Sequence, residues 1–190
     1  MNVVFVTGNP EKAENFARHI GMDISHESAE LDEIQTLSAA ELVGHKARQA
    51  YEQLGKPVLV EDVTFVYEAW GKLPGPFVKF FVNAENGTEK MCRMLDGFDN
   101  RRAEARCTFG YFDGHELKLF GGLISGEIAT SPRGTGGYGF DRIFEPDGFD
   151  GKTAAELNEV DYDTYYTTIK PFSAVRAFLQ SMTEGGIVES

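Results

Sequence analysis

The chain has 190 residues, of which 42% are hydrophobic and 12% aromatic, and its formal net charge at pH 7 is −12. Such a chain can bury a substantial core, so we expect one globular domain over residues 1–190. The acidic charge argues against nucleic-acid and acidic-membrane surfaces, because phosphate-rich partners recruit Lys and Arg. The start lacks the pattern of a secretion signal, and no apolar run approaches the ~20 residues of a membrane span. We therefore expect a cytoplasmic protein without a nucleic-acid or membrane partner.

The first predicted elements lie in residues 3–21, which read VVFVTGNPEKAENFARHIG. An apolar run is followed by a tight loop and then by apolar residues at helical spacing over residues 13–20. Asn9 suits the helix cap and Pro10 the first helical position. These signals predict a strand, a loop and a helix.

The loop between that strand and helix can bind an anion. A helix N-terminus leaves backbone N–H groups unpaired and carries a partial positive charge, which favours phosphate. Thr7, Asn9 and Lys12 can add side-chain donors. The alternative is an ordinary strand-to-helix turn, because short motifs of this kind also occur by chance.

A second helix is predicted over residues 37–55, where Ser38 and Glu41 form a capping box and Gly55 marks the end. Lys46 falls inside the apolar stripe of this helix. Its side chain either extends to water along its methylene stem or reaches a buried anion. The second alternative gains weight if a phosphate lies nearby.

Residues 57–62, PVLVED, predict a buried strand whose last residues emerge at the carboxyl edge of the sheet, where α/β sheets bind ligands. Glu61 and Asp62 can hold Mg²⁺ or activate a water molecule. Adjacent strand residues point to opposite faces, so we expect only one to face the site. The alternative is a solvated pair. Glu33 is either solvated or completes the metal site if its loop folds towards Asp62.

The middle of the chain, residues 103–129, predicts a long antiparallel hairpin with Asp113-Gly114 in a type I′ turn. Helices are expected near residues 89–95 and 171–182, followed by a frayed tail, residues 183–190. This order of elements indicates an α/β fold with a mixed sheet.

Residues 134–139, GTGGYG, match the dinucleotide-binding pattern, but no strand precedes them and no helix is expected after them. The sequence therefore does not favour a nicotinamide or flavin site. A flexible loop that presents Tyr138, Phe140 and Asp141 explains the segment better, because an aromatic ring can stack on a base and Asp141 can accept from a base N–H. The alternative is a structural turn whose aromatic residues pack into the core.

Other catalytic patterns are missing from the sequence. The four histidines show no metal-ligand spacing, and Cys92 and Cys107 lack the spacing of a disulfide framework or a zinc site. No Ser or Cys lies in a nucleophile elbow. The remaining hypothesis is metal and phosphate chemistry without a covalent intermediate.

Taken in order, several segments resemble the inosine triphosphate pyrophosphatase family. TGNPEK resembles the family's opening T-x-N-x-x-K, and LDEIQ, Lys46 and PVLVED follow at similar spacing. Similar family segments correspond to LPGPFVKFF, RAEARCTFGYF, SPRG, GFDRIF and KTAAEL. The resemblance extends to about Leu157 and implies an α/β fold with a mixed, elongated central sheet flanked by helices and a substrate cleft between two lobes.

The same resemblance implies hydrolysis of non-standard purine nucleoside triphosphates, such as ITP, dITP or XTP, to the monophosphate and pyrophosphate. It implies attack of water on the α-phosphorus, Mg²⁺ as the cofactor, and a homodimer. Asp62 and Lys46 are then catalytic, and Glu33 and Asp62 hold the metal. The substrate-binding residues that it implies are Thr7, Gly8, Asn9, Lys12, Lys46, Tyr138, Gly139, Phe140 and Asp141.

The chain departs from the family mainly where the base is recognised. Val63 replaces the usual hydroxyl residue after the aspartate, Arg142 replaces a proline, and Lys170-Pro171-Phe172 stands where the family has Ser-His-Arg. We therefore expect an altered base preference, with Arg142, Tyr166 or Lys170 as a replacement substrate-binding residue. The alternatives are a pyrophosphatase for other modified nucleoside triphosphates, including pyrimidines, and a catalytically silent nucleotide-binding protein.

Overall fold

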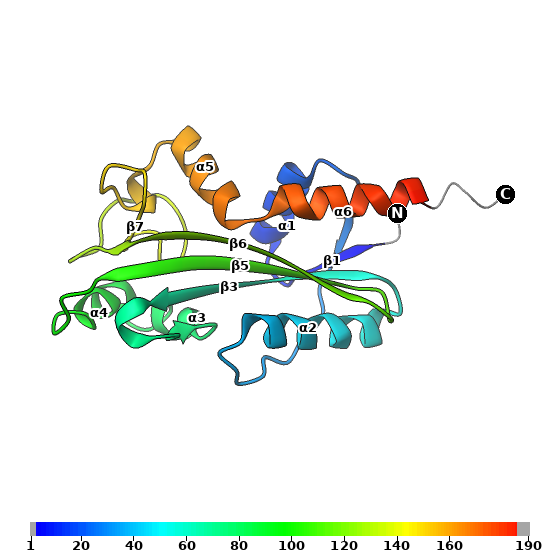
Figure 1. The fold of residues 1–190 in the computed structure, drawn as a ribbon, viewed down its shortest axis with the longest axis horizontal. Coiled ribbons are helices and arrows are strands. Elements are labelled where there is room, and N and C mark those ends of the chain that lie inside the picture. Colours follow the sequence, from blue (N-terminus) through cyan, green and yellow to red (C-terminus); the bar gives the residue numbers. More distant parts are fainter. Residues whose placement is uncertain (1–2, 186–190) are drawn as a thin grey trace. The chain divides into compact units, whose positions relative to one another are not determined.

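One mixed sheet organises the fold. In the computed structural model, which describes residues 3–185, seven strands form a sheet with the order β2-β1-β3-β5-β6-β7, and β4 pairs with β3 (Figure 1). β1 pairs in parallel with β2 and β3, whereas β4 and β7 pair antiparallel with their neighbours. The strands are β1 (Val4–Val6), β2 (Ser25–Glu27), β3 (Val58–Tyr67), β4 (Pro74–Gly75), β5 (Arg102–Phe112), β6 (Leu117–Ile128) and β7 (Phe144–Pro146).

Helices flank this sheet, so the expected α/β fold with a mixed central sheet is confirmed. The α-helices are α1 (Pro10–Ile20), α2 (Ala39–Leu54), α3 (Val78–Val82), α4 (Gly87–Arg93), α5 (Glu159–Ile169) and α6 (Phe172–Gly185), with short 3-10 helices η1 (Glu68–Trp70) and η2 (Ala154–Glu156). Across residues 3–185, none of these helices has the length and apolar character needed to span a membrane.

The chain forms two compact units. Among the described residues, unit 1 comprises residues 3–62, 108–121 and 171–185, and unit 2 comprises residues 63–107 and 122–170. The strands β3, β5 and β6 each contribute residues to both units. A single domain over residues 1–190 and a substrate cleft between lobes stay predictions.

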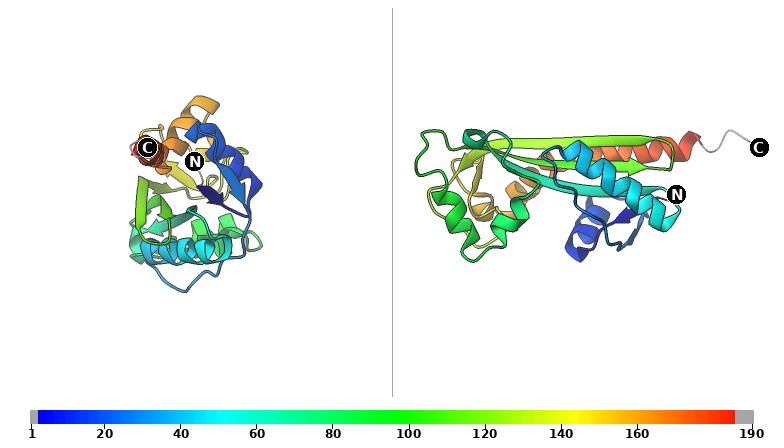
Figure 2. Two further views of the ribbon diagram at one scale, coloured as in Figure 1. Left: turned by 90° about the vertical axis from the view of Figure 1, so that its right-hand side faces the viewer. Right: turned by 90° about the horizontal axis from the view of Figure 1, so that it is seen from below.

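In unit 1, α1 and α6 lie on one face of the sheet and α2 lies on the other (Figures 1 and 2). The alternation of β1 explains this arrangement, because successive strand residues point to opposite faces. Phe5 stacks on Phe16 of α1, with 4.2 Å between ring centroids. Its neighbours Val4 and Val6 belong instead to the apolar cluster that includes residues of α2 and β3.

The predicted helix caps of unit 1 are confirmed, but the capping box of Ser38 and Glu41 is wrong. The N–H of Ser38 donates to Thr36 Oγ1 at 3.1 Å and the Thr36 hydroxyl donates to Glu41 at 2.6 Å, so Thr36 takes the place of Glu41 at the Ser38 N–H. Asn9 caps α1, and the left-handed Gly21 (φ 61°) ends it. Ser38 caps α2, and the left-handed Gly55 (φ 64°) ends it. α6 begins as expected but continues to Gly185, so residues 183–185 are helical, while the rest of the predicted frayed tail lies outside the described residues.

The third strand is longer than predicted, and this changes the position of the acidic pair. β3 continues from Val58 to Tyr67, because β-branched and aromatic residues follow Asp62 and favour extended backbone. Its parallel neighbour β1 ends at Val6, after Phe5 has paired with Leu59. Glu61 and Asp62 therefore lie inside β3, just beyond the end of β1, and not at the end of their own strand.

The hairpin of β5 and β6 forms where predicted, but its turn differs. The loop spans residues 113–116 rather than two residues. Gly114 has a positive φ of 98°, whereas Asp113 is not among the residues with positive φ, so the type I′ prediction is wrong. The carboxylate of Asp113 accepts from the N–H groups of His115 (2.9 Å) and Glu116 (2.8 Å), and these bonds close the wider loop.

In unit 2, α3 and α4 lie on one side of the strands and α5 on the other (Figures 1 and 2). α4 lies near the helix expected at residues 89–95, whereas β2, β4, β7, α3 and α5 were not predicted. α5 was missed because its residues Tyr165 and Ile169 are buried while most of its other positions are polar, so its sequence carries no wide apolar stripe.

We expect Tyr111→Phe to leave the free energy of unfolding unchanged or to raise it. Tyr111 is 1% exposed, and its hydroxyl has no hydrogen-bond partner in the described structure. An unpaired buried hydroxyl costs about 1–3 kcal/mol. Urea denaturation of both proteins measures the difference.

The matched comparison is Gly110→Ala in the same strand, where a new Cβ would lie 2.4 Å from Cγ1 of the buried Val43. Overpacking of this kind lowers stability by about 1–3 kcal/mol. A loss of similar size in Tyr111→Phe would contradict the prediction and show that the hydroxyl is bonded.

Candidate functional site

The loop between β1 and α1 is held by Asn9. The Asn9 Oδ1 atom accepts from the N–H groups of Glu11 (3.0 Å) and Lys12 (3.4 Å), and its carbonyl accepts from Ala13 N–H (3.2 Å). The N–H groups expected to be open at this helix N-terminus are therefore satisfied, and Pro10 has none. Within residues 3–185, no hydrogen bond engages the N–H of Gly8, which leaves this backbone donor and the side chains to meet an anion.

Two lysines meet the acidic pair of β3 from different helices. The Lys12 Nζ atom of α1 lies 3.1 Å from Glu61 Oε1, and the Lys46 Nζ atom of α2 lies 3.2 Å from Asp62 Oδ1. Because Glu61 and Asp62 are consecutive strand residues, they face opposite sides of the sheet, which are the sides that α1 and α2 cover. The sequence prediction that only one acid faces the site missed the pairing of Glu61 with Lys12.

Asp62 has one engaged and one open carboxylate oxygen. Lys46 donates to Oδ1, whereas Oδ2 is buried and has no partner among the described residues. Burial raises the pKa of Asp62, and Glu33 adds to this rise, while Lys46 and Lys12 oppose it. A carboxylate with a raised pKa and an open oxygen is suited to accept a proton or to bind a cation.

Glu33 joins this group from the segment between β2 and α2. Its Oε1 atom lies 3.8 Å from Lys46 Nζ, so the loop folds towards Asp62, the condition that the sequence prediction required. The side chains of Gln49 and Gln53 on α2 hold this loop. Gln49 exchanges two hydrogen bonds with Asp32 (2.7 and 3.0 Å), and Gln53 donates to the carbonyl of Glu30 at 2.8 Å.

Gln49 and Gln53 are positioning residues that sequence reasoning missed. The available signal was their spacing, because positions 46, 49 and 53 lie on one side of a helix. The chain therefore presents Lys46 and the two glutamines to the same loop.

The residues present fit a divalent cation with oxygen ligands, and the unpartnered Oδ2 of Asp62 is the atom that supports the fit. Across residues 3–185 there is no cluster of three or more His, Cys, Asp or Glu side chains with metal-site geometry. A magnesium ion needs fewer protein ligands, because it usually binds one or two carboxylates and completes its shell with water and substrate phosphate. Asp62 and Glu33 can supply these carboxylates.

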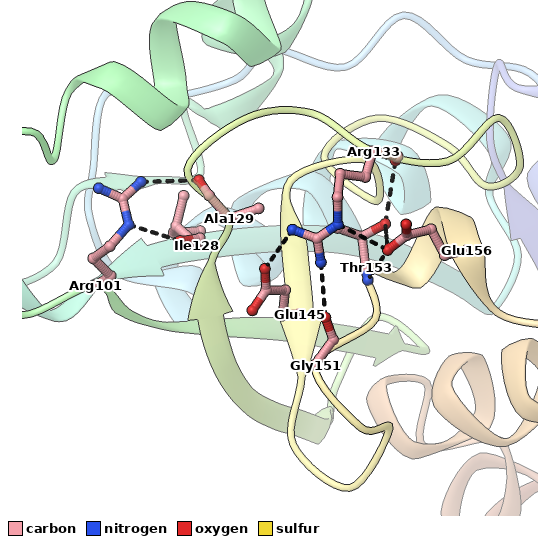
Figure 3. Close-up of polar contacts among 8 residues, drawn as sticks. All are labelled: Arg101, Ile128, Ala129, Arg133, Glu145, Gly151, Thr153 and Glu156. Atoms are coloured by element: carbon pink, nitrogen blue, oxygen red, sulfur yellow. Dashed lines mark hydrogen bonds and ion pairs between the residues drawn. The ribbon is translucent and has the colours of Figure 1, made fainter.

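The segment that follows β6 is tied down by two arginines (Figure 3). Arg101 donates to the carbonyls of Ile128 (2.8 Å) and Ala129 (2.9 Å) at its start. Arg133 donates to Glu145 (2.9 Å), Glu156 (3.1 Å) and the carbonyl of Gly151 (2.7 Å). These bonds, with backbone bonds such as Arg133 N–H to Arg142 O at 2.8 Å, hold both ends of the segment that the sequence analysis describes as a flexible loop.

Of the three side chains that this loop was predicted to present, one is exposed and two are buried. Tyr138 is 59% exposed, whereas Phe140 is 8% and Asp141 4% exposed. Phe140 stacks on Phe65 at 4.1 Å between ring centroids, so for Phe140 the alternative of packing into the core is confirmed. Gly139 has a positive φ of 61° and open space around its Cβ position.

Lys170, predicted as a replacement substrate-binding residue, is buried. It is 5% exposed, and its Nζ atom lies 5.4 Å from the ring centroid of Tyr166. Its charge lowers the pKa of Asp141, although burial has the larger effect and leaves that pKa raised. Lys170 therefore contributes its charge to the surroundings of Asp141. Arg142 remains exposed, and its Nε atom donates to the carbonyl of Gly134 at 3.3 Å.

Comparison with known proteins agrees with this architecture. The sequence model of the Ham1 family matches residues 3–177. Inosine triphosphate pyrophosphatase 2 of Trypanosoma cruzi is 38% identical over 178 residues, which cover 92% of this chain and 90% of the relative. Inosine triphosphate pyrophosphatase of Schizosaccharomyces pombe is 36% identical over 184 residues, which cover 95% and 96%.

Solved structures share the fold at lower identity. The Staphylococcus aureus Ham1 protein has a TM-score of 0.80 at 23% identity, over 95% of this chain and 99% of its own. A HAM1 protein from Coxiella burnetii has a TM-score of 0.82 at 23% identity, over 95% and 100%. The fold therefore defines an α/β protein with a mixed, helix-flanked sheet. The chain belongs to the Ham1 family, and the resemblance to inosine triphosphate pyrophosphatases seen in the sequence is confirmed.

We expect Gly137→Ala to be more destabilising than Gly139→Ala. Both glycines have positive φ, 72° and 61°, so both substitutions carry backbone strain of about 1–2 kcal/mol. At Gly137 the new Cβ would also lie 2.6 Å from Cβ and Oδ2 of Asp141, whereas at Gly139 it meets nothing within 4 Å. Urea denaturation then gives a further loss of about 1–3 kcal/mol for Gly137→Ala. Equal losses would contradict a fixed position for Asp141.

Proposed function

We propose that this protein is a magnesium-dependent nucleoside triphosphate pyrophosphatase that converts a non-standard purine nucleoside triphosphate, such as ITP, dITP or XTP, to the monophosphate and pyrophosphate. The observation that carries the proposal is the open, buried Oδ2 of Asp62 beside Lys46 and Glu33, in a chain whose relatives are named inosine triphosphate pyrophosphatases. The water nucleophile attacks the α-phosphorus, and no covalent intermediate is needed.

The cationic side chains of unit 1 bind the triphosphate in this proposal. Lys12 and Lys46 lie on helices that cover opposite faces of β3, and each already faces a carboxylate. When phosphate oxygens approach, each ammonium can share its donors between the carboxylate and the phosphate. Thr7, Gly8 and Asn9 supply the loop that follows β1, and we propose that the N–H of Gly8 donates to a phosphate oxygen.

Asp62 is the general base in this proposal, and Lys46 is the residue that fixes it. Lys46 holds Oδ1 at 3.2 Å and leaves Oδ2 to accept a proton from water. Burial raises the pKa of Asp62, which brings the carboxylate closer to the working pH and strengthens it as a base. Each carboxylate oxygen has two lone pairs, so Asp62 could also share a magnesium ion with Glu33, which would supply charge neutralisation at the phosphates.

The base of the substrate stacks on Tyr138 in this proposal. This ring is the exposed aromatic group of the loop, and base stacking on an aromatic side chain contributes about 1–3 kcal/mol. Lys170 is buried beside Tyr166, and the chain has no Ser-His-Arg cluster at residues 170–172. Few charged donors therefore read the base edge, and discrimination among bases is weaker than a hydrogen-bonding site achieves.

The proposal includes a cytoplasmic homodimer. The sequence resemblance supports two copies, and the buried Cys92 and Cys107, which are not joined in a disulfide within residues 3–185, agree with a compartment in which disulfides are rare. Sedimentation of the purified protein at several concentrations tests the number of copies.

The proposed activity is tested by incubating the protein with Mg²⁺ and a panel of triphosphates: ITP, XTP, dITP, ATP, GTP and dUTP. Pyrophosphate and orthophosphate are measured separately. We expect pyrophosphate release that chelation abolishes and that Asp62→Asn reduces by at least about 100-fold. Asp99→Asn is the matched control, because Asp99 is an exposed acid of unit 2 that takes no part in the contacts of Asp62, Lys46 or Glu33.

The outcomes separate the alternatives. Orthophosphate release, or full activity of Asp62→Asn, would contradict attack at the α-phosphorus with Asp62 as base. A preference for pyrimidine triphosphates would favour the related pyrophosphatase alternative. A strong preference for ITP and XTP over all other bases would support the proposed substrate class but contradict the weak base discrimination expected here. Binding without turnover would leave a nucleotide-binding protein.

We expect Gly8→Ala to lower substrate affinity without changing stability. A Cβ at Gly8 would meet only Ser28 Oγ, at 3.6 Å, and its φ is not positive, so the fold itself tolerates alanine. The methyl group would obstruct phosphate at the N–H, and KM should rise about tenfold. Gly97→Ala is the control, because Gly97 also has open space and no positive φ. Equal KM values for both variants would remove Gly8 from the site.

A further inference from the structure

Asp141 is the centre of a buried polar cluster in unit 2. Its Oδ2 atom accepts from the N–H of Tyr138 at 2.7 Å and from the hydroxyl of Tyr162 at 2.8 Å. Its Oδ1 atom accepts from the hydroxyl of Tyr165 at 2.9 Å. The side chain is 4% exposed, and both oxygens are engaged, so this geometry suits holding its partners in place rather than reading a ligand.

The residue that Asp141 holds is the exposed aromatic of the loop. Tyr138 lies between Gly137 (φ 72°) and Gly139 (φ 61°). Glycine permits many backbone φ and ψ angles, so without a restraint the backbone around Tyr138 could adopt several conformations. The bond from Tyr138 N–H to the buried carboxylate removes this freedom while the ring stays 59% exposed. A ring fixed before binding loses less conformational entropy when a ligand stacks on it.

We propose that Tyr162 and Tyr165 of α5 are positioning residues that act through Asp141 to fix Tyr138 for contact with the base of the substrate. This inference rests on the proposed function, because it takes Tyr138 as the stacking surface. It assigns to α5 a role in substrate affinity that requires no direct contact with the ligand.

Tyr165 and Tyr162 differ in burial and in packing. Tyr165 is 2% exposed, and its ring centroid lies 6.3 Å from that of the buried Phe144 in β7, so it also anchors α5 in the core. Tyr162 is only half-buried and stacks on Tyr166. Loss of the Tyr162 hydroxyl therefore removes a bond to Asp141 while the ring and its packing remain, which makes Tyr162→Phe the informative variant.

The test compares Tyr162→Phe with Tyr111→Phe, which makes the same chemical change at a hydroxyl that has no partner in the described structure. Two constants are measured for each protein: KM for ITP, and the inhibition constant of inorganic tripolyphosphate, which has no base. We expect KM of Tyr162→Phe to rise about tenfold, with kcat changed less than about threefold. The tripolyphosphate constant should equal that of Tyr111→Phe, because only the base contact is disturbed.

An unchanged KM would overturn the proposal, and so would a parallel rise in both constants, because that result indicates general loosening of the protein. Hydrogen exchange at the Tyr138 amide gives a second measurement that does not depend on activity. Faster exchange in Tyr162→Phe and in Asp141→Asn than in Tyr111→Phe is expected, and equal exchange overturns the proposal. If the native protein hydrolyses no triphosphate, the proposed function fails, while the exchange data still decide whether the tyrosines fix Tyr138.

Discussion

The contact between Lys46 and Asp62 is the constraint on which the rest of the candidate site depends. Asp62 is half-buried in a mostly buried strand and its Oδ2 atom is fully buried, and burial of a carboxylate is costly without a partner. Lys46 reaches it from α2 at 3.2 Å, and Lys12 reaches the adjacent Glu61 from α1 at 3.1 Å. Because adjacent strand residues face opposite sides, these two contacts require a helix on each face of β3. The acidic pair therefore fits an arrangement in which α1 and α2 cover opposite faces of β3.

Stability alone does not account for this arrangement. Buried ion pairs are often no more stabilising than apolar residues of similar size, because desolvation offsets the attraction. The Oδ2 atom of Asp62 is moreover buried without a partner, which lowers stability further. Lys46 also interrupts the apolar stripe of α2, which costs packing. Costs of this kind concentrate at functional sites, and here they fall on the atoms best placed to hold a cation or accept a proton.

The sequence predicted unit 1 better than unit 2 for a physical reason. Helix caps such as Asn9 and Ser38 interact with residues three or four positions away, so they can be predicted from the local sequence. The length of β3 and the pairing of Glu61 with Lys12 depend on neighbours distant in the chain, and both were misjudged. α5 carries no apolar stripe, and the hydrogen bonds of Asp141 involve residues 162 and 165 on that unpredicted helix. No local pattern could have shown that Asp141 is enclosed.

Asp62 and Asp141 show how the same residue type takes different roles. Burial raises the pKa of both carboxyl groups, so the direction of the shift does not distinguish them. The partners do. Asp141 accepts hydrogen bonds at both oxygens from three groups of the protein, so its carboxylate is suited to hold these groups in one position. Lys46 hydrogen-bonds one oxygen of Asp62, whereas the other oxygen has no partner among the described residues. The carboxylate therefore has a fixed orientation and still has lone pairs available for a proton or a cation. In the proposed function, Asp62 is therefore the reacting carboxylate and Asp141 is a positioning residue.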